Sequence, residues 1–302
     1  MVFKGSIVAL VTPLINDMVD THALQELVTW HANQGTDAVV VIGSTGESLL
    51  LSATERIEAV QAAMEGKRQS GNKIKIIAGA GTASTKDTIK MVQDVENCGV
   101  DGVMVVTPNY VRPTQAGAIA HFQAVAQHCN IPMIIYNHPG RTGTNLLWTT
   151  LIEICNTIES VIAIKDSSNN LGPISILRAN LPSRVSLLSG DDSTNIGFLA
   201  QGGDGIISVT ANLFPFLCKK FMTSWRDGNY KDAFATHQLL MPVHTAMFCE
   251  PNPCPVKYAL SKMGKIKNCV RMPLIAISDN SPSASTIVDS MLFVDKNVLG
   301  VK

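Results

Sequence analysis

The stretch GVDGVMVVTP, residues 99–108, indicates the fold, because two similar stretches occur elsewhere: GTDAVVVIG at 35–43 and GGDGIISVTAN at 202–212. Each one follows a segment with helical periodicity and opens with a glycine, one further residue and an aspartate. A glycine just past the last helical turn suits the left-handed C′ position, from which the chain turns into a strand. The strand runs are mostly apolar rather than alternating, which is typical of parallel strands covered on both faces.

Five other apolar runs have the length of a strand, and amphipathic segments such as 52–69, 84–97 and 114–128 separate the runs. These runs are SIVALV (6–11), KIKIIAGA (73–80), PMIIYN (132–137), SVIAIKD (160–166) and RVSLLSGD (184–191). With the three similar stretches they make eight strands that alternate with helices, which predicts a closed (β/α)8 TIM barrel. A doubly wound open sheet is the alternative, and it is disfavoured because no G-x-G-x-x-G follows the first strand.

The eight units end near residue 226, so we expect a catalytic barrel over residues 1–226 and a C-terminal helical region over 227–302. Helical periodicity in this region covers 230–247, 254–263 and 283–295. The pattern favours an extension appended to the barrel over an independent domain.

The composition argues against several classes of function. The chain is 46% hydrophobic and 16% charged, its net charge is zero, and charges of both signs are interspersed, so neither nucleic acid nor an anionic membrane is expected as a partner. We find no secretory signal and no run of roughly 18 apolar residues, which favours a cytoplasmic protein. The seven cysteines are scattered without a C-x-x-C pair, so we expect free thiols and no metal site.

Polar stretches follow the predicted strands, at the end of a barrel where chemistry gathers. They are GSTGES (43–48), TPNYVRP (107–113), YNHPGRTG (136–143), Lys165-Asp166 and SGDD (189–192). GSTGES is not a P-loop, because the G-K-[ST] ending is missing. Two glycines and two hydroxyls ahead of a helix can form a nest of backbone N–H groups that binds a carboxylate, although a flexible loop is the alternative.

Lys165 ends an apolar strand, where a lysine can simply extend its amine into solvent. At the barrel mouth a second interpretation is available. A free lysine amine is neutral in only about one molecule in 2,500 at pH 7. Enclosure by apolar walls favours the neutral amine, which can attack a ketone and form a Schiff base. We therefore predict that Lys165 is a Schiff-base lysine.

Three further side chains at the predicted mouth could take part. Tyr136 ends the strand before that of Lys165, and a phenol beside a carbonyl-reactive amine can move protons. Tyr110 follows the fourth strand, and Arg141 lies in a Gly- and Pro-containing turn that suits recognition of a carboxylate. Core tyrosines and a solvated loop arginine are the alternatives.

With these residues assembled, the chain resembles the dihydrodipicolinate synthase family, within the pyruvate-dependent class I aldolase and N-acetylneuraminate lyase superfamily. The likeness covers nearly the whole chain. GSTGES and IAIKDSS (162–168) mark the superfamily, whereas the arginine of YNHPGRTG and the segment EPNPCPVKYAL (250–260) are more specific to the synthase.

The resemblance implies a condensation of pyruvate with L-aspartate 4-semialdehyde to 4-hydroxy-tetrahydrodipicolinate, in lysine and diaminopimelate biosynthesis, without cofactor or metal. It implies a homotetramer built from two tight dimers. The resemblance implies that Lys165 forms the Schiff base and that Tyr136 transfers protons together with Thr45 and with a Tyr110 that crosses the dimer interface. It implies that Ser44 and Thr45 bind pyruvate and that Arg141 binds the second substrate. The backbone carbonyls of Gly190 and Ile207 are implied to line the pocket.

Two alternatives share these features in part. An N-acetylneuraminate lyase or a 2-keto-3-deoxy sugar acid aldolase of the same superfamily would use the same lysine and tyrosine, but such lyases generally lack an arginine at the position of Arg141. A non-catalytic barrel that binds a keto acid is the alternative from another class, and it would not need a set of proton-transferring groups.

The sequence departs from the family at two places. His138 stands where the family usually has a small apolar residue, so an imidazole two residues beyond Tyr136 could alter the pH profile. In the cleft where some members bind lysine as an inhibitor, Ser48 is present, but the aromatic residue expected before Tyr110 is not. The other matching positions are Ala53, Arg56, Ala83, Asp87 and Asn109.

We therefore predict weak or no feedback inhibition by lysine. The expected result is that condensation activity is nearly unchanged when lysine is titrated to millimolar concentrations. Half-inhibition by lysine well below one millimolar would contradict this prediction.

Overall fold

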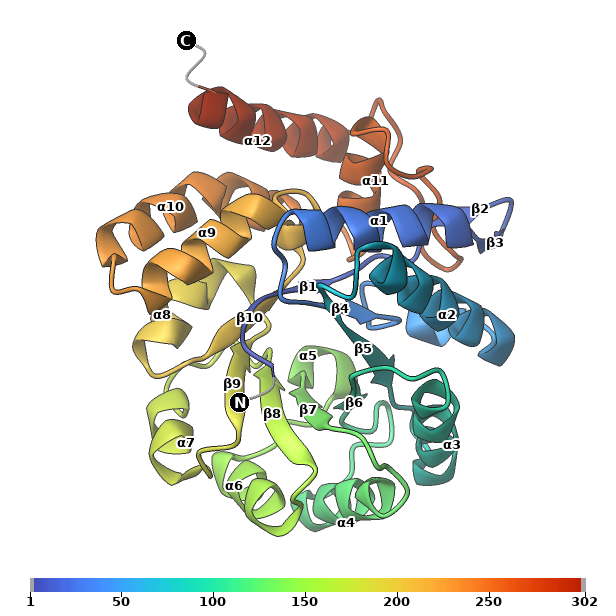
Figure 1. Cartoon of the computed structure of the whole chain (residues 1–302), viewed down its shortest axis with the longest axis vertical. Helices are drawn as coiled ribbons and strands as arrows, with labels where there is room; N and C mark the ends of the chain where they lie inside the picture. The colour runs from blue at the N-terminus through green and yellow to red at the C-terminus, as the bar shows by residue number, and fades with distance from the viewer. Residues whose placement is uncertain (1–2, 300–302) are drawn as a thin grey trace.

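A computed structural model describes residues 3–299, and it shows a ring of strands surrounded by helices (Figure 1). Eight strands form a closed barrel in which every neighbouring pair is parallel. Around the barrel they are β1 (Gly5–Ala9), β4 (Ala38–Val41), β5 (Lys75–Ala80), β6 (Gly102–Val106), β7 (Met133–Asn137), β8 (Val161–Asp166), β9 (Ser186–Ser189) and β10 (Gly205–Ser208). The predicted (β/α)8 barrel is confirmed, and the open doubly wound sheet is wrong.

Helices connect successive strands and form the outer layer of the barrel (Figure 1). They are α1 (Thr21–Asn33), α2 (Ala53–Gln69), α3 (Thr85–Glu96), α4 (Gln115–Ala126), α6 (Trp148–Thr157), α7 (Ile174–Asn180), α8 (Asn195–Ala200) and, after the last strand, α9 (Pro215–Arg226). The expected helices 52–69, 84–97 and 114–128 are confirmed to within two residues at each end. Their starts are set by N-caps, because the side chains of Ser52, Ser84 and Thr114 each accept a backbone N–H three residues later.

The three similar stretches share a backbone conformation. Gly35, Gly99 and Gly202 have φ of +82°, +81° and +100°, which places them in the left-handed region expected at a helix C-terminus. The stretches therefore turn from helix to strand as their pattern predicts.

The aspartate of each stretch ties its strand to the neighbouring strand and to an outer helix. Its carboxylate accepts a backbone N–H at the start of that neighbouring strand and pairs with a basic side chain. The contacts are Asp37 with Ser6 N (2.9 Å) and Lys219 Nζ (2.6 Å), Asp101 with Ile76 N (2.7 Å) and Lys67 Nζ (2.7 Å), and Asp204 with Leu187 N (2.8 Å) and Arg178 Nη1 (3.0 Å). The three bonds from backbone N–H groups to the aspartate carboxylates help to fix the stagger of the strands at the amino end of the barrel.

Apolar side chains fill the barrel and the space between its strands and the outer helices as two separate clusters. The inner cluster includes Ile7, Val40, Ile77, Met104, Ile134 and Leu188, all at most 3% exposed. The interior of the barrel is thus a packed core.

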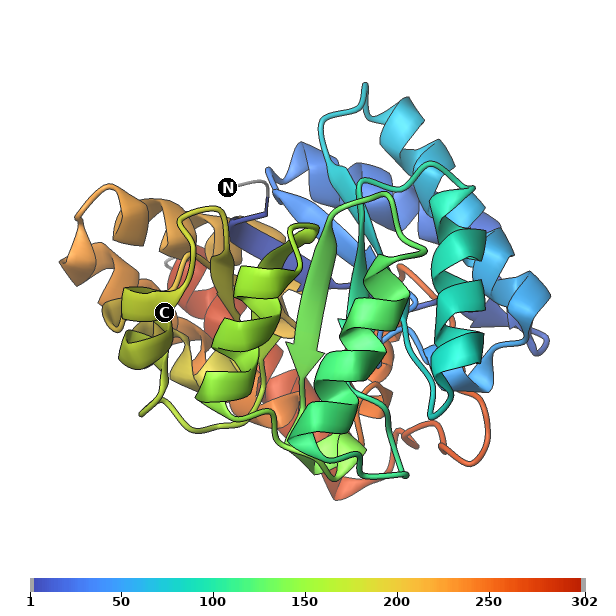
Figure 2. The same cartoon turned by 90° about the horizontal axis from the view of Figure 1, so that it is seen from below.

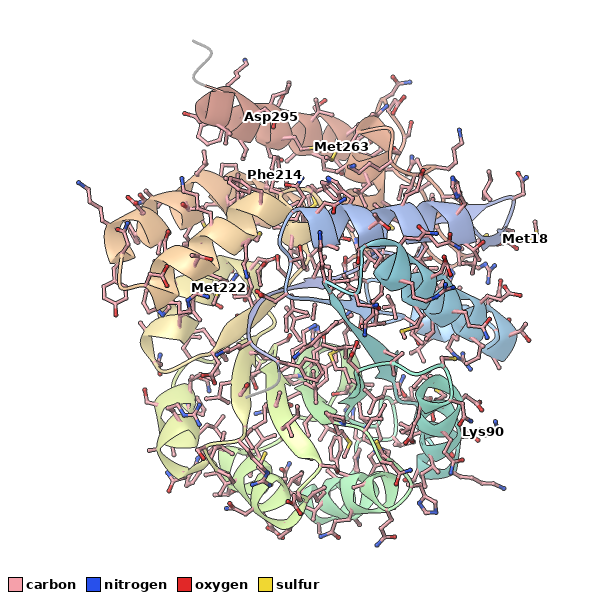
Figure 3. The ribbon with its side chains drawn as sticks, in the orientation of Figure 1. Met18, Lys90, Phe214, Met222, Met263 and Asp295 are labelled. Carbon is pink, nitrogen blue, oxygen red and sulfur yellow. The ribbon has the colours of Figure 1, made fainter. Side chains whose placement is uncertain are left out.

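A short hairpin that the strand pattern does not reveal follows β1. It pairs β2 (Leu14–Ile15) with β3 (Met18–Val19), and its turn residues Asn16 and Asp17 have φ of +50° and +60°. Two-residue hairpin turns favour such residues, because both central positions are left-handed. Met18 stands at the outer tip of this hairpin (Figure 3).

Beyond α9 the chain forms the expected helices α10 (Tyr230–Ala246), α11 (Cys254–Lys262) and α12 (Pro282–Leu299). In Figure 2 the arrowhead of β7 points to the side of the barrel where the orange segment after α11 also lies. The division of the chain at residue 226 remains our proposal. Among residues 3–299 we find no helix that is both long and apolar enough to span a bilayer.

Candidate active site

Lys165 and Tyr136 lie side by side at the carboxyl ends of β8 and β7. The two residues are direct neighbours in the parallel register, and the Lys165 amine lies 4.1 Å from the centre of the Tyr136 ring. Both side chains are 5% exposed. The adjacency expected from counting strands is confirmed, and Lys165 is buried although it stands at the mouth.

Gly190, at the end of β9, allows this close packing. A Cβ atom at this position would lie 2.8 Å from Lys165 Cε and 2.0 Å from Ser167 Oγ, so no larger residue fits without displacement. Gly190 and Ile207 line an enclosed recess of about 40 Å³ together with Lys165 and Tyr136. The Gly190 carbonyl already accepts the Ser167 hydroxyl at 3.2 Å, which leaves its second lone pair available.

The turn GSTGES borders the same recess through Ser44 and Thr45. The N–H groups of Glu47 and Ser48 are bonded within the turn, to the carbonyls of Ser44 and Gly43. Within residues 3–299 the N–H groups of Ser44 and Thr45 have no acceptor. The turn leads into a short 3-10 helix, η1 (Ser48–Leu50), rather than directly into α2, so the free N–H groups of Ser44 and Thr45 belong to the loop and not to a helix N-terminus.

Asn252, which the strand pattern does not single out, joins the tail to this turn. Its side-chain amide donates to Thr45 Oγ1 at 3.0 Å, and it lines both the recess and a larger cavity beside it. The segment EPNPCPVKYAL marks the residue only as part of a family motif. Asn252 contacts Thr45, which lies 207 positions earlier in the chain, only because the fold brings the two residues together.

Arg141 lies on the single-turn helix α5 (Pro139–Thr142), which begins directly after His138. Its backbone N–H donates to the His138 carbonyl at 3.0 Å, and its guanidinium donates to the backbone carbonyl of Asn252 at 3.5 Å. Arg141 lines the larger cavity, of about 470 Å³, together with Tyr136 and Ser44. The cationic side chain is thus exposed at the entrance to the recess.

The structure does not bring Tyr110 into the cavities of its own chain. Its side chain is 91% exposed, and its backbone is left-handed with φ of +67°. Within the described residues it makes no hydrogen bond, and none joins Tyr136 to Thr45. A relay through Tyr110 is therefore not formed by one chain alone.

His138 borders the recess and packs edge-on against Tyr136, with ring centres 5.6 Å apart. Burial lowers the pKa of its imidazole from 6.5 to about 4, and the positive charges of Arg141 and Lys165 add to this effect. The imidazole is therefore neutral at neutral pH, and it adds no charge to the site.

The closed barrel, with polar side chains gathered at one mouth, defines the class of the protein as a TIM-barrel enzyme. Within that class the chain belongs to the Dihydrodipicolinate synthetase family, whose sequence model matches residues 2–289. The chain is therefore related to lyases of lysine and diaminopimelate biosynthesis.

Individual relatives agree with this assignment. The chain is 39% identical over 277 residues to a 4-hydroxy-tetrahydrodipicolinate synthase of Bradyrhizobium diazoefficiens, a match that covers 92% of each chain. Its fold superposes on the same synthase of Methylacidiphilum fumariolicum with a TM-score of 0.95 and 32% identity, covering 99% of this chain and 98% of that one. It also superposes on dihydrodipicolinate synthase of Acinetobacter baumannii, solved in complex with pyruvate, with a TM-score of 0.91 and 34% identity, covering 97% and 99%.

The neutral state of His138 gives a test by pH. We expect its imidazole signals in NMR to shift near pH 4 and not near pH 6.5. Between these values the unfolded chain takes up a proton at this site that the folded chain does not, so folding stability is lost as the pH falls. The variant His138→Val should lose less stability over this window than the parent, and it should keep the parent's pH–rate profile above pH 5. A rate inflection near pH 6.5 that disappears in the variant would contradict this view.

Proposed function

We propose that the chain condenses pyruvate with L-aspartate 4-semialdehyde to form 4-hydroxy-tetrahydrodipicolinate. The observation that carries the proposal is the buried Lys165 amine, 4.1 Å from the Tyr136 ring centre, in a recess that opens beside Arg141. Membership of the family and the pyruvate complex of the Acinetobacter baumannii relative support it.

In the proposed first half of the reaction, the Lys165 amine adds to the pyruvate ketone, and water leaves as the Schiff base forms. The pyruvate carboxylate is held by the free N–H groups of Ser44 and Thr45 and by their hydroxyls. The carbonyls of Gly190 and Ile207 line the opposite part of the recess and orient the polar hydrogens of the intermediate. Tyr136 donates its phenol proton to the hydroxyl that leaves as water, and the resulting phenolate then takes a methyl proton, which gives a nucleophilic enamine.

In the second half, the enamine carbon attacks the aldehyde of the second substrate, and Tyr136 returns its proton to the new alkoxide. The substrate amine then attacks the Schiff-base carbon and closes the ring, which releases the Lys165 amine. Arg141 binds the carboxylate of the aldehyde substrate, because a guanidinium pairs with a carboxylate through two parallel hydrogen bonds. The same residue favours this substrate over sugar-acid aldehydes.

Tyr110 would complete the site from a neighbouring subunit. Its 91% exposure, next to the exposed Val111, supports a place in an interface, where its hydroxyl could reach the proton path of the partner. We propose a tight dimer on this ground and, from the family resemblance, a tetramer of two such dimers. We also propose a cytoplasmic location.

Borohydride reduction in the presence of pyruvate tests the mechanism. We expect irreversible loss of activity and a pyruvate adduct on the peptide that contains Lys165. Lys165→Met should lower the condensation rate at least a thousandfold and prevent labelling, whereas Lys90→Met, on the exposed face of α3, should behave like the parent. Labelling of a different lysine, or none, would show that the proposed function is wrong.

Mixing two inactive variants tests the shared site. Tyr110→Ala and Lys165→Met each impair every site of their own homodimers. A mixed dimer has one site with both residues intact, so exchange of subunits should restore about a quarter of the parent activity. If Tyr110 acts within its own chain, the mixture gains no activity over the separate variants.

A further inference from the structure

Glu47, in the turn GSTGES, forms an ion pair with Lys257 of α11 in the interior of the protein. The two side chains are 1% and 0% exposed. The second carboxylate oxygen of Glu47 accepts the backbone N–H of Arg271 at 2.8 Å. Within the part of the chain that the structure describes, Glu47 is the sole acceptor for the Lys257 amine. Neither residue has a role in the reaction derived above.

A buried ion pair is weak evidence for a contribution to stability. Two charges lose their hydration when they are buried, and apolar residues of similar volume often stabilise a fold equally well. Burial lowers the pKa of Lys257, and the Glu47 carboxylate opposes that shift. Unlike an apolar pair, an ion pair fixes the relative position of its two side chains, because the amine and the carboxylate hold one another at a defined separation.

The turn that Glu47 belongs to has two strained positions. Ile42 and Glu47 have φ of +46° and +57°, and left-handed backbone is rare for a β-branched residue such as isoleucine. Such conformations persist only where the surroundings impose them. The turn is held on one side by the Thr12 hydroxyl, which donates to the Gly46 carbonyl at 2.8 Å, and on the other side by the Glu47 carboxylate.

The strained residues flank Ser44 and Thr45, whose N–H groups are free. The tail reaches this segment at two points, since Asn252 bonds the Thr45 hydroxyl and Lys257, five residues later, pairs with Glu47. Release of the Glu47 carboxylate would remove a contact that holds its left-handed backbone, and a change of that backbone would displace the adjoining Ser44–Thr45 segment.

We propose that Glu47 and Lys257 are positioning residues, which hold the Ser44–Thr45 segment in the conformation that binds the carboxylate of a 2-keto acid. The C-terminal helical region is thereby part of the binding site for the first substrate. This inference rests on the proposed function, because it takes pyruvate to be that substrate.

The test measures how the rate of borohydride inactivation depends on pyruvate concentration. In Glu47→Gln/Lys257→Met both charges are removed and the volume is kept. We expect the pyruvate concentration for half-maximal inactivation to rise at least tenfold, while the maximal rate at saturating pyruvate stays within threefold of the parent. The double variant should melt at a higher temperature than Glu47→Gln alone, in which a buried lysine has no partner.

Lys67→Met is the matched control, since it breaks a partly buried ion pair with Asp101 at the opposite end of the barrel. It should lower the melting temperature and change the half-saturating pyruvate concentration less than twofold. Glu47→Asp keeps both charges but shortens the carboxylate side chain, and it should raise that concentration more than threefold. This variant decides the question if the double variant does not fold.

An unchanged pyruvate dependence in the folded variants would overturn the proposal, because the pair would then serve stability alone. Failure of the proposed function is a separate result. In that case pyruvate does not promote labelling of Lys165 even in the parent protein.

Discussion

The stagger at which eight parallel strands close into a barrel is the constraint on which the site depends. Asp37, Asp101 and Asp204 help to set it, because each joins the start of a neighbouring strand to its own strand and to a basic side chain of an outer helix. A shift by one residue would move every side chain of a strand to the opposite face. The direct register of Tyr136 with Lys165 comes from the parallel pairing of β7 with β8 within this closed ring.

The recess contains a neutral imidazole and two backbone N–H groups that have no acceptor within the described residues. His138 is uncharged at neutral pH because of its burial and of the nearby cations, and Ser44 and Thr45 present backbone N–H groups. Such donors hold a carboxylate without a mobile counter-charge. Arg141 lines both the recess and the larger cavity beside it, so its positive charge lies where the two cavities adjoin.

The tail after residue 226 contributes directly to this recess. Asn252 bonds Thr45, and Lys257 neutralises Glu47, so the turn after β4 is held from a part of the chain more than 200 residues away. Both partners of the Glu47 carboxylate, the Lys257 amine and the Arg271 N–H, belong to the tail. This is the physical reason to regard the tail as an extension of the barrel.

The amino-acid sequence by itself determined the alternation of strands and helices, the left-handed glycines of the three similar stretches, and the polar residues at the strand ends. These features are local, since they follow from apolar runs, helix caps and backbone preference. The pattern also places Lys165, Tyr136, Ser44, Thr45 and Arg141 near one mouth, because parallel strands bring their carboxyl ends together. Only the tertiary structure decided the pairing of Glu47 with Lys257, the bond from Asn252 to Thr45 and the absence of Tyr110 from its own cavity. Such contacts join residues far apart in the chain, and no local pattern specifies which buried charge will meet which partner.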